Sequence, residues 1–143
     1  MISSIASQSA GKATRENINE YITNTQRAIG KLSGINKNKV IINLNPSNPP
    51  VNMMNSIFFE CKNFDKKKIK KVNLFLKKIN KTIKKYIPGY NAKLFYQNNE
   101  NFFRVTIRVI GSGDYLSTFA GNLDIITSSS AYIGKLLNEK YYY

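Results

Sequence analysis

A run of small and polar residues near the start of the chain has the composition of an anion-binding loop. It extends from Ser7 to Asn17, follows a short apolar segment at 1–6 and leads into a predicted helix. Small residues let the backbone approach a ligand closely, and the free N–H groups of a helix N-terminus attract phosphate or carboxylate. An ordinary strand-to-helix connection has the same local features, so the loop alone leaves both interpretations open.

Residue types that carry most enzyme chemistry are scarce. The sequence contains no histidine, and Cys61 is its single cysteine. A histidine-based zinc site and a Ser-His or Cys-His catalytic pair therefore cannot be formed within this chain. A lone cysteine at the end of a predicted strand is typical of a small buried hydrophobe rather than a nucleophile. Gly111-Ser112-Gly113 lacks the third glycine of a dinucleotide fingerprint and is interpreted as a turn.

The charge is strongly one-sided. Twenty-two basic residues against eight acidic ones give a net charge of +14, which favours association with polyanions. Ten lysines follow Asp65 on one predicted helix, where they form either a polyanion-binding surface or the solvated outer side of a helix that covers a sheet. We favour the solvated side, because no aromatic residues are interleaved with the lysines as a stacking platform requires. Nucleic acid is therefore not expected as a partner.

No apolar run approaches the roughly twenty residues of a membrane span, and no secretory signal is recognised. We expect a cytoplasmic protein without membrane contact. Hydrophobic patterning predicts strands at 1–6, 39–44, 53–61, 90–96 and 103–109, with a turn at 98–101. It predicts helices from a Thr14 N-cap to about Lys31, from Asp65 to Pro88, and over the segment that carries Ile125 to Leu137.

This order of elements determines the expected fold class. A strand, a helix, two strands, a long helix, two strands and a final helix predict an α+β domain with a mixed, mostly antiparallel sheet covered by helices. The 143 residues are expected to form a single domain, 1–143. In the strand at 103–109, strict alternation is expected to bury Phe103, Val105, Ile107 and Val109 on one face.

Several segments, in this order, resemble the acylating acetaldehyde dehydrogenases. They are Ser3–Ile18, Asn45–Pro50, Tyr86–Tyr90, Gly113–Leu116 and Ala120–Ile125. The resemblance extends over essentially the whole chain and corresponds to the C-terminal half of that family. It implies the C-terminal dimerisation/catalytic domain of GAPDH-like dehydrogenases. It also implies that the N-terminal Rossmann domain and the nucleophilic cysteine lie outside this chain.

The resemblance implies an enzyme of aromatic-compound breakdown that converts acetaldehyde, NAD and coenzyme A to acetyl-CoA and NADH. The chain alone is then expected to be inactive, as one subunit of a split enzyme or a truncated remnant. Its expected partners are a second copy in a homodimer, a complementing N-terminal-half chain, and 4-hydroxy-2-oxovalerate aldolase. The alternatives are a non-catalytic dimerisation or aldolase-binding scaffold and a basic polyanion-binding module.

The family pattern also assigns roles to individual positions. The resemblance implies NAD contacts by Ser9, Ala10, Gly11, Lys12, Ala13, Thr14, Arg15, Glu16, Asn17 and Asn122. This chain has Lys12-Ala13 where the family has Pro-Gly, and Met54-Asn55 where it has an Arg-Asp pair whose aspartate is important in catalysis. The segment at 97–101 is shorter than in the family. We therefore expect no catalytic residue and no metal ligand in this chain.

Overall fold

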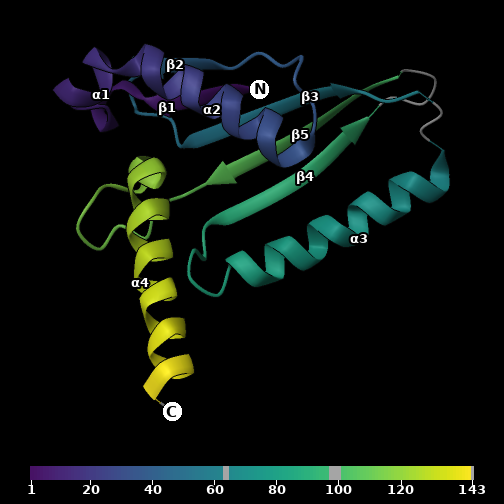
Figure 1. Cartoon of the computed structure of the whole chain (residues 1–143). Coiled ribbons are helices and arrows are strands. Elements are labelled where there is room, and N and C mark those ends of the chain that lie inside the picture. The colour runs from purple at the N-terminus through teal and green to yellow at the C-terminus, as the bar shows by residue number, and fades with distance from the viewer. Residues whose placement is uncertain (63–64, 97–100, 143) are drawn as a thin grey trace.

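The computed structural model describes residues 1–62, 65–96 and 101–142 (Figure 1). The described strands are β1 (Ile2–Ala6), β2 (Ile41–Asn45), β3 (Met53–Glu60), β4 (Tyr90–Tyr96) and β5 (Phe102–Val109). The helices are α1 (Lys12–Glu16), α2 (Ile18–Ser33), α3 (Lys66–Ile83) and α4 (Gly121–Tyr142), with short 3₁₀ turns η1 (Ser7–Ser9) and η2 (Thr118–Ala120). The predicted turn at 98–101 lies largely outside the described residues.

The five strands form one sheet in the order β2-β1-β3-β5-β4. β1 and β2 are parallel, whereas the β1–β3, β3–β5 and β4–β5 pairs are antiparallel. The predicted alternation in β5 is confirmed in part, because Phe103 and Val109 are buried and Arg104 and Arg108 are exposed, whereas residues 105–107 are all half-buried. The predicted α+β class with a mixed, mostly antiparallel sheet is confirmed.

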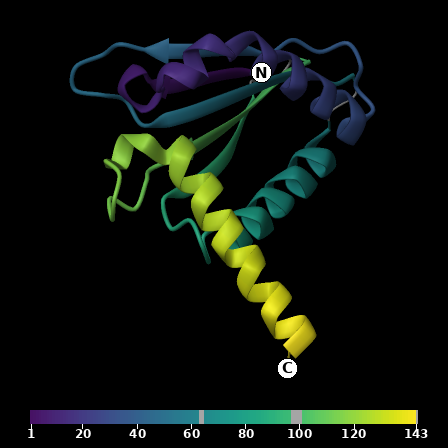
Figure 2. The ribbon, with the colours of Figure 1, turned by 60° about the vertical axis from the view of Figure 1, so that its left-hand side comes forward.

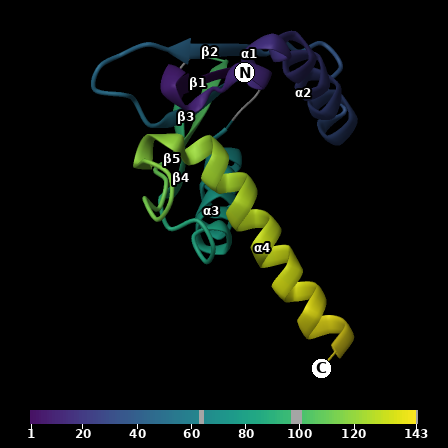
Figure 3. The ribbon, with the colours of Figure 1, turned by 90° about the vertical axis from the view of Figure 1, so that its left-hand side faces the viewer.

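Helices cover one face of this sheet. β1 and β2 share a direction, and so do β3 and β4, since each of the latter is antiparallel to β5. Right-handed crossovers place both connecting helices, α2 and α3, on the same face, and Figure 3 shows the helices on one side of the strands. The opposite face is uncovered: Met54, Phe58 and Phe95 are 41%, 51% and 44% exposed there.

The long helix α3 forms as its sequence predicts. The Asp65 carboxylate caps it by accepting a hydrogen bond from the Lys68 backbone N–H at 2.7 Å. Its apolar stripe packs on the sheet, where the core contains Leu76, Ile79, Ile83, Ile87, Tyr90, Ala92 and Val109. All ten lysines between 66 and 85 remain exposed.

The first helical region differs from the prediction of one helix capped by Thr14. α1 begins at Lys12 with Gly11 as its N-cap, so Thr14 lies inside the helix and the predicted cap is wrong. Asn17 separates α1 from α2, and its side-chain amide donates to the Ala13 carbonyl at 2.9 Å. The Asn17 backbone N–H also donates to the Ala13 carbonyl, at 3.1 Å, and the φ of −106° and ψ of 16° at Asn17 depart from helical geometry and divide the helix there. α2 ends at Gly34, whose φ of 73° favours glycine.

The last helix begins earlier than expected and projects from the body (Figure 2). Gly121 starts α4 in close contact with β5, because a Cβ there would lie 2.7 Å from the Val109 carbonyl oxygen. The rings of Tyr86 and Tyr132 stack with centroids 4.6 Å apart. One side of α4 is open, because Ile126, Ile133, Leu137 and Tyr141 are 50–67% exposed. α4 is packed against the domain only as far as Tyr132, since residues 133–141 are all exposed.

Candidate functional site: a loop and two asparagines at one end of the sheet

The loop that follows β1 is folded tightly at its start. The Ser9 hydroxyl donates to the Ala6 carbonyl at 2.8 Å, and the Ala10 N–H donates to the Ser7 carbonyl at 3.2 Å. Ser9 and Ala10 are 8% and 5% exposed. Two of the ten residues predicted to contact NAD therefore serve to hold the loop against β1.

Arg15 folds back over this loop. Its Nε donates to the Ala10 carbonyl at 3.1 Å, and its Nη2 donates to the Ser7 carbonyl at 2.8 Å and to the Ser7 hydroxyl at 2.9 Å. The planar guanidinium presents several donors in a rigid arrangement, which a lysine at this position does not reproduce. Arg15 thus acts as a clamp for the loop and leaves a positive charge beside it.

The rest of the loop is open to ligands. Gly11, Lys12, Ala13, Glu16 and Asn17 are exposed, and Thr14 is half-buried. A Cβ at Gly11 would meet no atom within 4 Å, so there is open space beside this backbone. Lys12 and Glu16 form an exposed ion pair at 3.8 Å. Because α1 has only five residues, its dipole is smaller than that of the long helix expected from the sequence.

Asn122 lies in the first turn of α4 and brings an amide to the site. Its Oδ1 is buried and has no hydrogen-bond partner within the described residues. The first turn is held in place by Asp124, whose Oδ2 accepts from the Ser112 N–H at 2.7 Å. Buried polar atoms are usually hydrogen-bonded in proteins, and Asn38 Oδ1, before β2, is buried in the same way without a partner among the described residues.

Asn55, inside the sheet, is a second asparagine of this region with a buried amide oxygen. It lies in β3 between Ser3 of β1 and Ile107 of β5, and its Oδ1 is likewise buried without a partner among the described residues. An amide at this position can donate or accept a hydrogen bond, but it cannot act as a general base. Sequence periodicity does not reveal such unpaired atoms, because they depend on neighbours from other strands.

The sheet topology brings these residues together. β1 ends where β3 begins and β5 ends, as the Ser4–Met54 and Met53–Val109 pairs show. β1 contacts η2, which leads directly into Asn122. In Figure 1, α1, the start of β3 and the start of α4 lie at the same side of the molecule. Cys61 follows the opposite end of β3 and is therefore remote from this site.

The groups at this site are polar and suited to binding an anionic or polar ligand. The described residues hold no group of three or more His, Cys, Asp or Glu side chains placed to bind a metal ion. Within the same residues, no helix is long and apolar enough to cross a membrane. What the site offers is backbone N–H groups, two unpaired amide oxygens and the Arg15 charge.

Comparisons with known proteins agree with this architecture. Residues 1–117 match the family model described as prokaryotic acetaldehyde dehydrogenase, dimerisation. Acetaldehyde dehydrogenase of Pectobacterium atrosepticum is 36% identical over 140 residues, which is 98% of this chain and 46% of that protein. The Burkholderia pseudomallei (strain 668) and Spirochaeta aurantia enzymes are 41% and 39% identical over 91% of this chain and 43% of their own length.

The chain thus spans a little under half the length of these relatives. The family match covers the whole sheet and its two covering helices, and the relatives extend the similarity into α4. The chain belongs to the prokaryotic acetaldehyde dehydrogenase family and carries its dimerisation domain.

Proposed function

We propose that this chain supplies the dimer-forming and cofactor-contacting part of an acetylating acetaldehyde dehydrogenase, which converts acetaldehyde, NAD and coenzyme A to acetyl-CoA and NADH. The observation that carries this proposal is the meeting of the Gly11–Asn17 loop with the unpaired amides of Asn55 and Asn122 at one end of the sheet. The reaction takes place in the cytoplasm during aromatic-compound breakdown, beside 4-hydroxy-2-oxovalerate aldolase.

The residues present fit one side of a dinucleotide site. Asn122 Oδ1 is a buried acceptor without a donor, which a carboxamide or hydroxyl group of the dinucleotide satisfies. Open space at Gly11 permits close approach of a ligand to the backbone, and the Arg15 charge favours an anionic one. When bound, NAD accepts the hydride and coenzyme A takes the acyl group. This chain's own residues position the dinucleotide and exclude water.

The nucleophile comes from a complementing chain in this proposal. Cys61 follows the end of β3 that is remote from the loop after β1, and Asn55 has no carboxylate to activate a reacting group. The exposed apolar stripe along α4, formed by Ile126, Ile133, Leu137 and Tyr141, gives such a chain a surface to dock on. Assembly then brings the catalytic cysteine to the loop and Asn122.

Homodimerisation is assigned to the uncovered face of the sheet. This open face is defined by Ile2, Ile41, Met54, Phe58, Phe95, Phe102, Arg104 and Arg108. The Arg104 guanidinium lies 4.7 Å from the centroid of the Phe95 ring, so apolar and cationic groups are combined there. Such a mixed surface with a central aromatic cluster suits a two-fold interface between identical copies.

Reconstitution tests the proposal. The chain is mixed with a separately expressed Rossmann-domain chain of an acetaldehyde dehydrogenase that carries the catalytic cysteine, and NADH formation from acetaldehyde is followed with and without coenzyme A. We expect activity that depends on both chains and on coenzyme A. A well-folded complex without activity contradicts the split-enzyme proposal.

Asn55→Asp is the informative variant in this assay. It restores a carboxylate at the position where the family has one, so we expect a rate increase of at least about 10-fold. Asn122→Ala should instead raise the KM for NAD. If wild type and Asn55→Asp both form stable dimers and both remain inactive, the second candidate applies: a non-catalytic dimerisation or aldolase-binding scaffold, which the amide at Asn55 favours.

A further inference from the structure

Lysines are more concentrated on α3 than an even distribution of the chain's lysines would place there. Ten of them occur between residues 66 and 85, and no aspartate or glutamate occurs from 66 to 99. We call this set the lysine face: Lys66, Lys67, Lys68, Lys70, Lys71, Lys77, Lys78, Lys81, Lys84 and Lys85. Genomes rich in A and T encode more lysine, but this bias acts along a whole protein chain. It therefore does not account for a cluster of lysines on one helix.

The lysine face carries an energetic cost. Lys66 and Lys70, like Lys77 and Lys81, are four residues apart on the helix, where like charges repel. Lys66 begins the first turn, where the helix dipole disfavours a positive charge. Lys66, Lys70 and Lys77 have no carboxylate partner within the described residues. An anionic ligand along this face relieves the repulsion.

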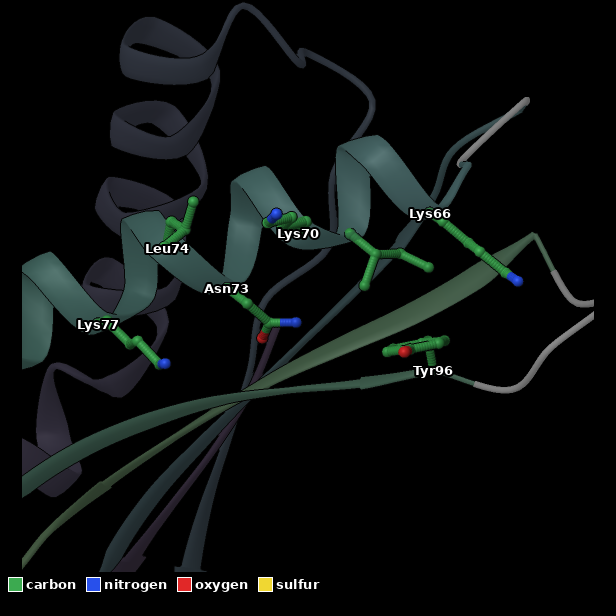
Figure 4. A pocket seen from close by; sticks show the side chains of 7 residues that line it. Lys66, Lys70, Asn73, Leu74, Lys77 and Tyr96 are labelled. Atoms are coloured by element: carbon green, nitrogen blue, oxygen red, sulfur yellow. The ribbon is translucent and has the colours of Figure 1, made fainter.

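A groove runs beside these lysines, between α3 and the edge strand β4 (Figure 4). A cavity of about 500 Å³ is lined by Lys66, Ile69, Lys70, Asn73, Leu74, Lys77 and Tyr96. A second cavity of about 540 Å³ shares Asn73 and Lys77 with it and continues to Lys93 of β4. Among the residues that the structure describes, no carboxylate lines either cavity. The groove is therefore continuous, cationic and open along the helix.

Tyr96 adds an aromatic ring to the lining of the groove, whereas Phe75 of α3, which is 61% exposed, lines neither cavity. Figure 4 shows its ring beneath the helix, on the side where Lys66, Asn73 and Lys77 project. The residue is 42% exposed at the end of β4. A cationic groove that follows the helix and an aromatic ring on which a base can stack are the two elements that sequence-tolerant single-strand binding proteins combine.

Other anionic partners fit less well. Membrane insertion needs a free apolar helix face, whereas Leu76, Ile79 and Ile83 pack against the core and the exposed Leu74 and Phe75 lie among lysines. An acidic protein surface does not require the ring of Tyr96 in the groove. A duplex is too wide to place its bases against a ring that lies beneath the helix.

From these observations we propose that the lysine face and the α3–β4 groove bind single-stranded nucleic acid without sequence preference, with lysines on the phosphates and Tyr96 stacked on a base. This proposal differs from the expectation drawn from the sequence that nucleic acid is not a partner. That expectation rested on the lack of aromatic residues interleaved with the lysines. The nucleic-acid proposal is independent of the proposed dehydrogenase function. The groove lies along β4 at one edge of the sheet, whereas β1 and its loop lie next to β2 at the other edge.

Fluorescence anisotropy with a fluorescein-labelled 20-nucleotide oligo-dT tests the proposal. The variant K66Q/K70Q/K77Q is compared with K31Q/K37Q/K39Q, which removes the same charge from exposed lysines at the end of α2 and before β2. We expect at least 10-fold weaker binding for the α3 variant at about 50 mM NaCl. Its slope of log affinity against log salt should also be lower by about 2, since each lost phosphate contact removes about 0.7. The control should change affinity by less than half as much on a logarithmic scale.

Tyr96→Ala and Tyr96→Phe separate stacking from charge attraction. Alanine should weaken oligo-dT binding about 10-fold, whereas phenylalanine should leave it within about two-fold. Circular dichroism spectra that match wild type exclude misfolding as the cause. Equal losses in the two triple variants, no effect of Tyr96→Ala, tighter binding of a 20-base-pair duplex, or equal competition by polyglutamate would each overturn the proposal.

Discussion

Asn80 of α3 pairs with the backbone of Ala92 in β4 through two hydrogen bonds. Its Nδ2 donates to the Ala92 carbonyl at 2.9 Å, and its Oδ1 accepts from the Ala92 N–H at 2.8 Å. β4 is an edge strand, so these backbone groups point away from β5 and have no strand to pair with. One side-chain amide therefore completes the edge and fixes α3 on the sheet.

Replacing Asn80 by alanine should destabilise the domain. The change leaves a part-buried N–H and C=O without partners, which costs about 2 kcal/mol of unfolding free energy. Urea unfolding followed by circular dichroism measures this loss. Asn73→Ala is the matched control, because Asn73 is an exposed asparagine two turns earlier on the same helix. Because alanine has a higher helix propensity than asparagine, the control should not be destabilised, and a similar loss in both variants would show that the bond to Ala92 does not determine the effect.

Arg15→Lys should loosen the loop without unfolding the domain. Lysine keeps the charge but cannot make the three hydrogen bonds to Ser7 and Ala10 at once. We expect amide hydrogen exchange of residues 7–17 to become about 10-fold faster, while exchange in β5 is unchanged. Arg27→Lys on α2 serves as the control, since Arg27 makes a single long contact with Asn24 at 3.4 Å. Unchanged exchange in the loop would mean that Arg15 does not hold it.

Phe58→Glu should dissociate the homodimer. Phe58 lies within the open face directly opposite Arg104 of β5, so the substitution replaces an aromatic ring buried in the dimer by a carboxylate beside Arg104, and a buried ion pair does not make up for the lost apolar contact. The dimer dissociation constant should rise at least about 100-fold, as measured by sedimentation velocity. Phe75→Glu introduces the same change at an exposed phenylalanine of α3 and should leave the dimer intact. A dimer that tolerates Phe58→Glu would place the interface elsewhere on the molecule.

Stability should fall at alkaline pH partly through Tyr90. Burial raises the pKa of Tyr90 above its ordinary value of 10.0, and the nearby Tyr86 raises it further. Because the unfolded state then loses the proton first, this contribution is fully present below pH 10 and is lost as pH rises through the higher folded-state pKa. In urea titrations, Tyr90→Phe should show a smaller decline in stability above pH 10 than wild type. Tyr115→Phe, at a fully exposed ring, should follow wild type.

Several elements follow from the sequence because their signals are local. Alternation in Phe103–Val109 and the three- and four-residue spacing from Ile69 to Ile83 depend only on which face of each segment is buried. The same signals, taken in order, predict the mixed, mostly antiparallel sheet that the strands form. Family membership is also readable in the sequence, since the similarity extends along most of the chain.

Boundaries were less predictable than the elements themselves. The expected helix from Thr14 to Lys31 is divided at Asn17, whose φ of −106° and ψ of 16° are not helical. The last helix begins at Gly121, where a residue without a side chain fits against the Val109 carbonyl. Propensity and periodicity do not describe such features of a single residue.

By itself, the sequence determined the fold class, the order of the elements and the family of this protein, because apolar periodicity and motif spacing are properties of a single segment. Only the tertiary structure decided that Arg15 clamps its own loop, that Asn55 and Asn122 have unpaired oxygens at one end of the sheet, and that Tyr96 lies beside the lysines of α3. Those relationships depend on strand register and crossover handedness, which set the distance between residues far apart in the chain.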